Sequence, residues 1–384
     1  MSATPLLDLE QAAPAAPRRR RGLGIYTGVA VGLAWIALDI LQDRGILPAW
    51  RLPENNIWLL LPIAYVAIAI HELGHAAAGW LAGLGMGGIS VGPLLWQKSG
   101  SRWVFRWMWR LWGGGMFKPL TAAAGLDPRP FAWSVAGGPI ASLGLTALAV
   151  LLWVRYGDGG WSWIGTLILA SLLTLALSII PWSFGLQKTD GARLWQFLRH
   201  PDQARQVMGL LGVQSEEAKG VRPRDWSPAL FDAMMLVDRS SATWSWCNLM
   251  ASYRGFDAGA GDKALEYLER ALAESGRAGK PMRHALFLEA ACSSAVWRKD
   301  AGHAREWLRR ACKEHKPRST EAAEAAIAMR EERYDDAIAH WERARAYVDK
   351  LRLDSGLIRF AKEKWTDLAA ECLAAEERKE KALR

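Results

Sequence analysis

The segment IWLLLPIAYVAIAIHELGHAAAGWLAG, residues 57–83, is a long apolar stretch that contains ionisable side chains. It is long enough for a helix that crosses a bilayer. On a helix, His71 and His75 share one face because they are four residues apart. Their rings can bind one metal ion while Glu72 between them reaches a water molecule at the metal. The stretch therefore predicts a metal-dependent hydrolase centre within a membrane helix.

The cost of placing these side chains at membrane depth favours a bound metal. A central charge costs roughly 2.5–3.5 kcal/mol on insertion scales, so three ionisable residues within five need a compensating partner. A structural zinc ion can contribute on the order of 10 kcal/mol. We therefore expect Zn²⁺ as the cofactor.

The 384-residue chain changes character along its length, with an apolar N-terminal half and a charged C-terminal half. Its formal net charge is +9, but much of the positive charge flanks apolar segments, where membrane orientation explains it better than nucleic-acid binding. The cysteines all lie in the charged half without a CxxC spacing, which is typical of reduced thiols. They are Cys247, Cys292, Cys312 and Cys372. We expect a mainly α-helical protein with no nucleic-acid partner.

Four apolar segments predict transmembrane helices. They cover about residues 23–41, 57–82, 131–154 and 163–181. Residues 1–21 contain prolines and end in four arginines, which is typical of a disordered tail. Residues 22–200 are expected to form the membrane-embedded domain of a multi-pass cell-membrane protein.

The distribution of Lys and Arg predicts the orientation of these spans. The tail and residues 84–130 carry ten of these residues, whereas the segments on the opposite side carry three. Because short loops rich in Lys and Arg stay in the cytosol, we expect a cytosolic N-terminus. Four crossings then place residues 201–384 in the cytosol as well.

A small β element at the membrane interface is predicted between the second and third spans. Gly88 to Trp96 and Arg102 to Trp107 resemble short strands separated by turn residues. The alternation of Arg and Trp fits an edge strand at the membrane surface. Backbone without helical hydrogen bonds is tolerated there only where it packs on protein or lines a wet cavity. Such an edge can pair with an extended peptide. An interfacial loop without a substrate role explains the pattern equally well.

The C-terminal half contains a helical repeat. Residues 264–271, 304–311 and 337–344 align with small and large apolar residues in register. The second and third follow alanine-rich segments, residues 285–297 and 321–329, which gives helix-turn-helix units. The pattern resembles the tetratricopeptide repeat, and a generic array of helical hairpins explains it as well. We expect residues 201–384 to form a soluble helical domain that can bind a cytosolic protein partner.

Asp190 is the best candidate for a third metal ligand, which a catalytic zinc site usually requires. The other five histidines all follow the last predicted span. After Pro181 the chain can fold back beneath the membrane face towards the second span, which brings Asp190 close to it. Thr189-Asp190-Gly191 also opens a predicted helix, where aspartate is common as an N-cap. Metal ligand and helix cap are thus alternative roles for Asp190.

Three ordered motifs carry a family resemblance. They are His71 to His75 in a membrane helix, Gly137-Gly138-Pro139-Ile140-Ala141-Ser142 in a later span, and Pro181 followed by Thr189 to Gly191. Over roughly residues 55–200 the chain resembles the site-2 protease family, the intramembrane zinc metalloproteases of peptidase family M50.

The resemblance implies an activity and roles for individual residues. His71, His75 and Asp190 would be zinc ligands, and Glu72 the general base and acid. The substrate would be a membrane protein, cut within or next to a transmembrane segment. Ser142 departs from the family pattern, which often has an asparagine there, and the asparagine common before the proline of the last motif is also absent.

The sequence thus predicts an intramembrane zinc metalloendopeptidase with a cytosolic helical domain that recruits a substrate or a regulator. The alternative is a catalytically lapsed membrane adaptor whose repeats bind a protein partner. The intact Glu72 favours activity, because a lapsed enzyme has no reason to keep it.

Overall fold

The structure is a computed structural model that describes residue 44 and residues 57–99, 102–108, 114–120, 126–156, 162–184, 187–241, 243–314, 320–350 and 354–383. The predicted tail, residues 1–21, and the first predicted span, residues 23–41, lie outside the described residues. Within the described part the chain is mainly helical with a small antiparallel sheet.

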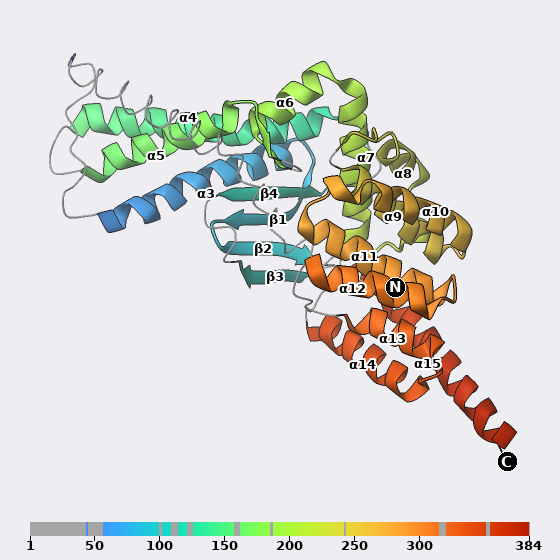
Figure 1. Cartoon of the computed structure of the whole chain (residues 1–384). Coiled ribbons are helices and arrows are strands. Elements are labelled where there is room, and N and C mark those ends of the chain that lie inside the picture. The colour runs from blue at the N-terminus through green and yellow to red at the C-terminus, as the bar shows by residue number, and fades with distance from the viewer. Residues whose placement is uncertain are drawn as a thin grey trace.

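Three apolar helices form the first part of the molecule: α3 (Ile57–Leu81), α4 (Arg129–Tyr156) and α5 (Ser162–Ile179). They pack side by side, with α3 in contact with both others (Figure 1). Their positions confirm the helices predicted at residues 57–82, 131–154 and 163–181. Two stretches, Leu61–Leu81 and Arg129–Tyr156, are long and apolar enough to cross a membrane, and α5 is shorter. The prediction of four spans is therefore not confirmed by the described residues.

Glycines allow α3 and α4 to approach closely. A Cβ atom on Gly74 of α3 would lie 2.4 Å from the carbonyl oxygen of Gly137 of α4, and one on Gly137 would lie 2.3 Å from that of Gly74. Any side chain at either position would therefore collide with backbone. Close packing through small residues is typical of helices in membranes. This contact brings the predicted histidine ligands of α3 next to α4.

A four-stranded antiparallel sheet lies between α3 and α4 in the sequence. Its strands are β1 (Gly85–Val91), β2 (Leu94–Ser99), β3 (Arg102–Trp107) and β4 (Gly115–Leu120), in the order β3-β2-β1-β4. The predicted segment Gly88 to Trp96 covers the end of β1, a turn and the start of β2, and the predicted segment Arg102 to Trp107 is β3. Strand β3 is an edge strand as expected. Strand β4 was not predicted. Its Gly115 and Pro119 weaken strand propensity, and β4 pairs along one side only, with β1.

One face of the sheet lies against α3. The strand register places Phe117, Ile89, Trp96 and Phe105 in one row across the four strands. Phe117 of β4 lies beside Gly79 of α3, whereas Trp96 and Phe105 at the far end of the row are exposed. Strands β1 and β4 both contact α3, the predicted catalytic helix.

The chain returns towards α3 after α5. A short hairpin, β5 (Ser183–Phe184) and β6 (Gln187–Lys188), follows Pro181 and leads into α6 (Asp190–Arg199). Helix α6 packs on α4, where the rings of Phe131 and Phe197 lie 5.3 Å apart. The predicted return of the chain is therefore confirmed, and part of the connection is a hairpin.

The remaining chain is helical. Its elements are α7 (Pro201–Ala218), η2 (Pro223–Asp225), α8 (Pro228–Met234), α9 (Trp244–Asp257), α10 (Gly261–Ala273), η3 (Ser275–Arg277), α11 (Lys280–Val296), α12 (Ala301–Glu314), α13 (Glu321–Arg330), α14 (Tyr334–Lys350) and α15 (Gly356–Leu383). Helices α9 and α10, α11 and α12, and α13 and α14 pack as hairpins. The array predicted from residue 201 onward is confirmed as helical.

The aligned small and apolar residues of the repeat are its buried positions. Ala264, Leu268 and Ala271 of α10 are buried, and so are their counterparts in α12 and α14. The counterparts are Ala304, Leu308 and Ala311, and Ala337, Trp341 and Ala344. Helix α9, the partner of α10, lacks the alanine-rich pattern of α11 and α13, so the sequence analysis missed the first half of the first hairpin.

Helix α15 passes the C-terminal ends of α9, α11 and α13 in turn. Phe360 clusters with Phe256 at the end of α9, and the amino group of Lys364 lies 5.6 Å from the ring centroid of Trp297, which caps α11. Further on, Lys379 pairs with Glu332 after α13 at 3.4 Å. The buried face of α15, including Trp365, joins the core of the last two hairpins. Helices α11 to α14 and the C-terminal helix therefore share one core.

Candidate metal site

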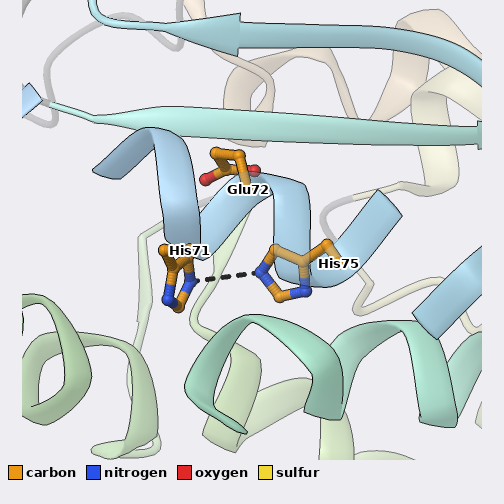
Figure 2. A group of neighbouring side chains, drawn as sticks. All are labelled: His71, Glu72 and His75. Atoms are coloured by element: carbon orange, nitrogen blue, oxygen red, sulfur yellow. Dashed lines mark hydrogen bonds between the residues drawn. The ribbon is translucent and has the colours of Figure 1, made fainter. Parts of the chain in front are cut away.

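Helix α3 presents its ionisable residues in two directions (Figure 2). His71 and His75 point towards α4, and Glu72 points towards the sheet. All three side chains are buried, and their ligand atoms lie within 4.8 Å of one another. This His-Glu-His cluster can hold a metal ion.

Asp190 joins the two histidines from α6, although it is 119 residues from His71 in the sequence. Its Oδ2 atom lies 3.1 Å from Nε2 of His71 and 3.3 Å from Nε2 of His75. The two Nε2 atoms lie 3.1 Å from each other. Donor atoms bound to a tetrahedral zinc ion at about 2.0–2.1 Å lie roughly 3.3–3.4 Å apart. The three donors therefore lie close to the spacing of ligands around one tetrahedral metal ion.

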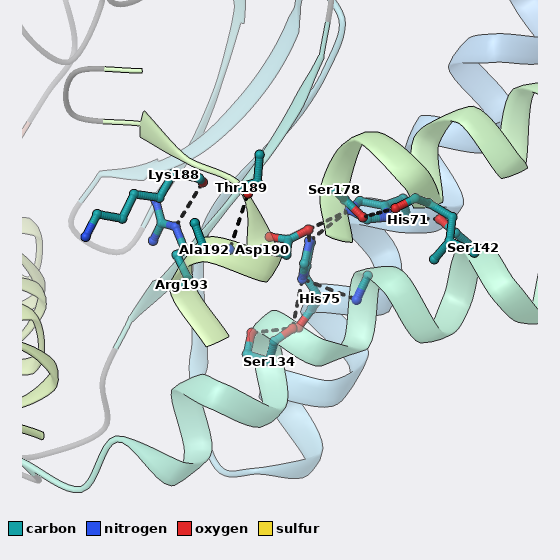
Figure 3. A network of polar contacts seen from close by, with 12 residues as sticks. His71, His75, Ser134, Ser142, Ser178, Lys188, Thr189, Asp190, Ala192 and Arg193 are labelled. Atoms are coloured by element: carbon teal, nitrogen blue, oxygen red, sulfur yellow. Dashed lines mark hydrogen bonds and ion pairs between the residues drawn. The ribbon is translucent and has the colours of Figure 1, made fainter. Parts of the chain in front are cut away.

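The start of α6 places Asp190 at this point (Figure 3). Thr189 is the N-cap, and its side-chain oxygen accepts a hydrogen bond from the backbone N–H of Ala192. The alternative role of Asp190 as the N-cap is therefore wrong, because Thr189 has that role. A Cβ atom on Gly191 would lie 1.7 Å from the carbonyl oxygen of Ile179. Glycine after Asp190 is thus required for α6 to meet the end of α5.

The electrostatic surroundings keep Asp190 ionised. Burial acts to raise the pKa of its carboxyl group, but hydrogen bonds from His71 and His75 outweigh burial and hold that pKa at about 2. A metal ligand must be deprotonated. Asp190 therefore has the charge state that metal binding needs at neutral pH.

Helix α4 supplies hydrogen-bond partners to both histidine rings (Figure 3). Nδ1 of His75 lies 2.8 Å from the backbone carbonyl oxygen of Ser134, and Nδ1 of His71 lies 2.9 Å from the hydroxyl oxygen of Ser142. The hydroxyl of Ser134 also donates to the backbone carbonyl of His75 at 2.9 Å. Both rings thus direct Nε2 towards Asp190.

Gly138 of α4 provides the space for the two rings. A Cβ atom there would lie 2.3 Å from Nε2 of His75 and 2.8 Å from Nε2 of His71. Even alanine would therefore collide with the two nitrogens that face Asp190. The Gly-Pro motif thus lies against the site.

Glu72 lies under strand β4. A Cβ atom on Gly115 would lie 2.3 Å from Oε1 of Glu72. The Oε2 atom of Glu72 is buried and has no hydrogen-bond donor among the described residues. This carboxylate is therefore close to the candidate ligands and has one oxygen available to accept a proton.

The structure brings together the four predicted site residues, His71, Glu72, His75 and Asp190. The contacts of Ser134 and Gly115 were not predicted, because no motif gave a signal for them. Ser142 was noted as a departure from the family pattern, but its contact with His71 was not predicted.

Comparisons with known proteins return no match: no family model, no curated protein and no solved structure is similar to this chain. The resemblance to the site-2 protease family stays a prediction that rests on the motifs. The same holds for the resemblance to the tetratricopeptide repeat.

Proposed function

We propose that the chain is an intramembrane zinc metalloendopeptidase that hydrolyses a peptide bond within or next to a transmembrane segment of another membrane protein. The observation that carries the proposal is the set of three donor atoms of His71, His75 and Asp190, spaced 3.1 to 3.3 Å apart. Their arrangement supports a zinc site with two imidazoles and one carboxylate, and it leaves a fourth position for water or substrate.

Glu72 is the proton carrier of the proposed reaction. A zinc ion held by the three ligands would supply Lewis-acid chemistry, by activating water and polarising the peptide carbonyl. Oε2 of Glu72 is unpaired among the described residues and can accept the proton of the attacking water. Glu72 then returns a proton to the leaving amine. Burial of this carboxylate between α3 and β4 limits competing contacts with bulk solvent.

The exposed surfaces of α3 and α4 support a membrane location. In the most apolar stretch of each helix, 22% of the residues of α3 and 39% of those of α4 are buried inside the protein. A core helix of a soluble protein is mostly buried. Large apolar side chains face outward on both, including Val66 and Leu73 on α3 and Leu143 and Leu151 on α4. Lipid is the environment in which such surfaces are stable. We place the helical domain, residues 201–384, on the cytosolic side.

The experiment combines metal analysis with cleavage. Purified full-length protein is assayed for bound zinc and for cleavage of a transmembrane model substrate, in parallel with Glu72→Gln. We expect one zinc per chain in both proteins and cleavage by the wild type. If the wild type holds no zinc, or if Glu72→Gln cleaves as fast, the protease proposal is wrong. A wild type that binds a partner protein but neither binds zinc nor cleaves would favour the adaptor.

A reporter fused after residue 384 tests the orientation. We expect its activity in the cytosol. An extracytoplasmic reporter would contradict the topology and leave the metal chemistry unaffected.

A further inference from the structure

The two candidate histidine ligands are held by chemically different groups. Nδ1 of His75 faces a backbone carbonyl, that of Ser134, at 2.8 Å. Because a carbonyl can only accept, Nδ1 carries the proton in the tautomer that binds a metal through Nε2. Nδ1 of His71 faces a side-chain hydroxyl instead, that of Ser142, at 2.9 Å. A single substitution can therefore remove the partner of His71 but not that of His75.

We propose that Ser142 is a positioning residue of the metal site: its hydroxyl oxygen accepts a hydrogen bond from Nδ1–H of His71 and directs Nε2 towards Asp190 and His75. The inference rests on the proposed zinc site. A histidine that binds a metal through one nitrogen usually donates its other N–H to a partner that fixes the ring. Ser142 has this place relative to His71, since Nε2 of the same ring lies 3.1 Å from Oδ2 of Asp190.

The surroundings of Ser142 make its hydroxyl hard to replace. Ser142 has 0% of its surface exposed, so bulk water cannot take over the contact with Nδ1 of His71. Its backbone carbonyl accepts a hydrogen bond from the hydroxyl of Thr146 at 2.9 Å, and that hydroxyl lies 2.8 Å from Oγ of Ser171 on α5. This turn of α4 is thus tied to α5.

Ser134 provides a matched control. It is also buried on α4, at 1% exposure, and its hydroxyl also bonds to α3 at 2.9 Å. That bond ends on the backbone carbonyl of His75, and the group that holds the ring of His75 is the backbone of Ser134. Ser134→Ala therefore removes a comparable contact between the helices but leaves both rings with their partners.

The test measures metal binding by the full-length protein in detergent. Zinc affinity is determined by competition with a chromophoric chelator, and the visible spectrum of the Co²⁺-loaded protein reports ligand geometry. Ser142→Ala is expected to weaken zinc binding by about 10- to 100-fold and to alter the cobalt spectrum. Ser134→Ala is expected to weaken zinc binding less than Ser142→Ala does, because the ring of His75 keeps the backbone carbonyl of residue 134 as its partner. Thermal midpoints of the metal-free proteins should be similar for the two variants.

A second pair of variants keeps the test valid if Ser142→Ala fails to fold. Threonine and valine have nearly the same shape and differ by the hydroxyl. Ser142→Thr should bind zinc more tightly than Ser142→Val by the same 10- to 100-fold factor. Equal affinities in this pair would overturn the inference, and so would wild-type affinity and spectrum in Ser142→Ala. An equal loss in Ser134→Ala would also overturn it, because the effect would then be general helix packing.

The failure of this inference can be distinguished from the failure of the proposed function. A wild type that binds zinc and cleaves, with Ser142→Ala unchanged, refutes the role of Ser142 alone. A wild type that binds no zinc refutes both.

Discussion

The backbone of Gly138 lies against the ring of His75, so that a Cβ atom at Gly138 would be 2.3 Å from Nε2 of His75. Its N–H also lies 3.3 Å from Nδ1 of the same ring. A glycine on one helix thus sets the position of a candidate metal ligand on another. This relationship gives a direct test of the site.

Gly138→Ala should reduce zinc binding by at least about tenfold, the scale of effect typical of residues that orient metal ligands. The added methyl group pushes the rings of His71 and His75 away from Asp190. The measurement is zinc content of the purified protein after dialysis against a chelator.

Gly144→Ala is the control for Gly138→Ala. Gly144 lies on the same helix, and a Cβ atom there would meet nothing within 4 Å. Both changes raise helix propensity equally, by about 1 kcal/mol. Zinc retention in Gly138→Ala equal to that in Gly144→Ala would contradict the packing argument.

Gly115→Ala should separate catalysis from metal binding. Its Cβ atom would collide with Oε1 of Glu72, and Glu72 is not one of the three proposed ligands. We expect cleavage to fall by at least about a hundredfold, the scale of general acid–base catalysis, with zinc content unchanged.

Gly114→Ala controls for Gly115→Ala, because the neighbouring glycine has open space around its Cβ position. It should cleave like the wild type. If Gly115→Ala lost zinc as well as activity, the assignment of Glu72 as a proton carrier that is not a ligand would be wrong.

Asp190→Asn should release zinc, since the amide keeps the shape of the side chain but loses the negative charge that two imidazoles face. The measurement is again bound zinc, together with the rate of its removal by chelator. Asp202→Asn on the exposed start of α7 is the matched change and should have no effect. Unchanged zinc retention in Asp190→Asn would require another third ligand.

Trp365→Ala should destabilise the helical domain by about 3–5 kcal/mol, the usual cost of removing a large aromatic side chain from a core. Trp365 is 2% exposed within the core shared by α15 and the last hairpins. Leu373→Ala on the same helix removes a side chain that is 53% exposed and should change stability by less than about 0.5 kcal/mol. Helix melting followed by circular dichroism measures both. Equal melting of the two variants would mean that α15 contributes little to this core.

The candidate ligands could be predicted because each belongs to a motif with local geometry. The spacing of His71 and His75 fixes their common face on any helix, and the Asp-Gly pair follows the end of an apolar segment. The contact of Ser142 with His71 could not be predicted in this way, since it depends on how α4 is rotated and packed against α3. The pairing of β4 with β1 depends on the same packing, because Gly115 and Pro119 of β4 weaken the local strand signal.

The helical repeat could be predicted in part from the sequence. The alignment of Ala264, Ala304 and Ala337 identified buried positions, since small residues recur where helices touch. Helix α9 lacks this pattern and packs through larger side chains, among them Tyr253 and Phe256. A repeat search therefore finds α11 and α13 but not their predecessor.

Helix α15 has a consequence for partner binding. Its contacts with Phe256, Trp297 and Glu332 cover the edge formed by successive hairpins, and its Trp365 lies in their core. A separate protein that binds to that edge would have to compete with α15. Because α15 is tethered to the array, its effective concentration there reaches the millimolar range. At this edge the array is therefore already occupied by α15. A partner that binds without displacing α15 would use the outward surfaces of α10, α12 and α14.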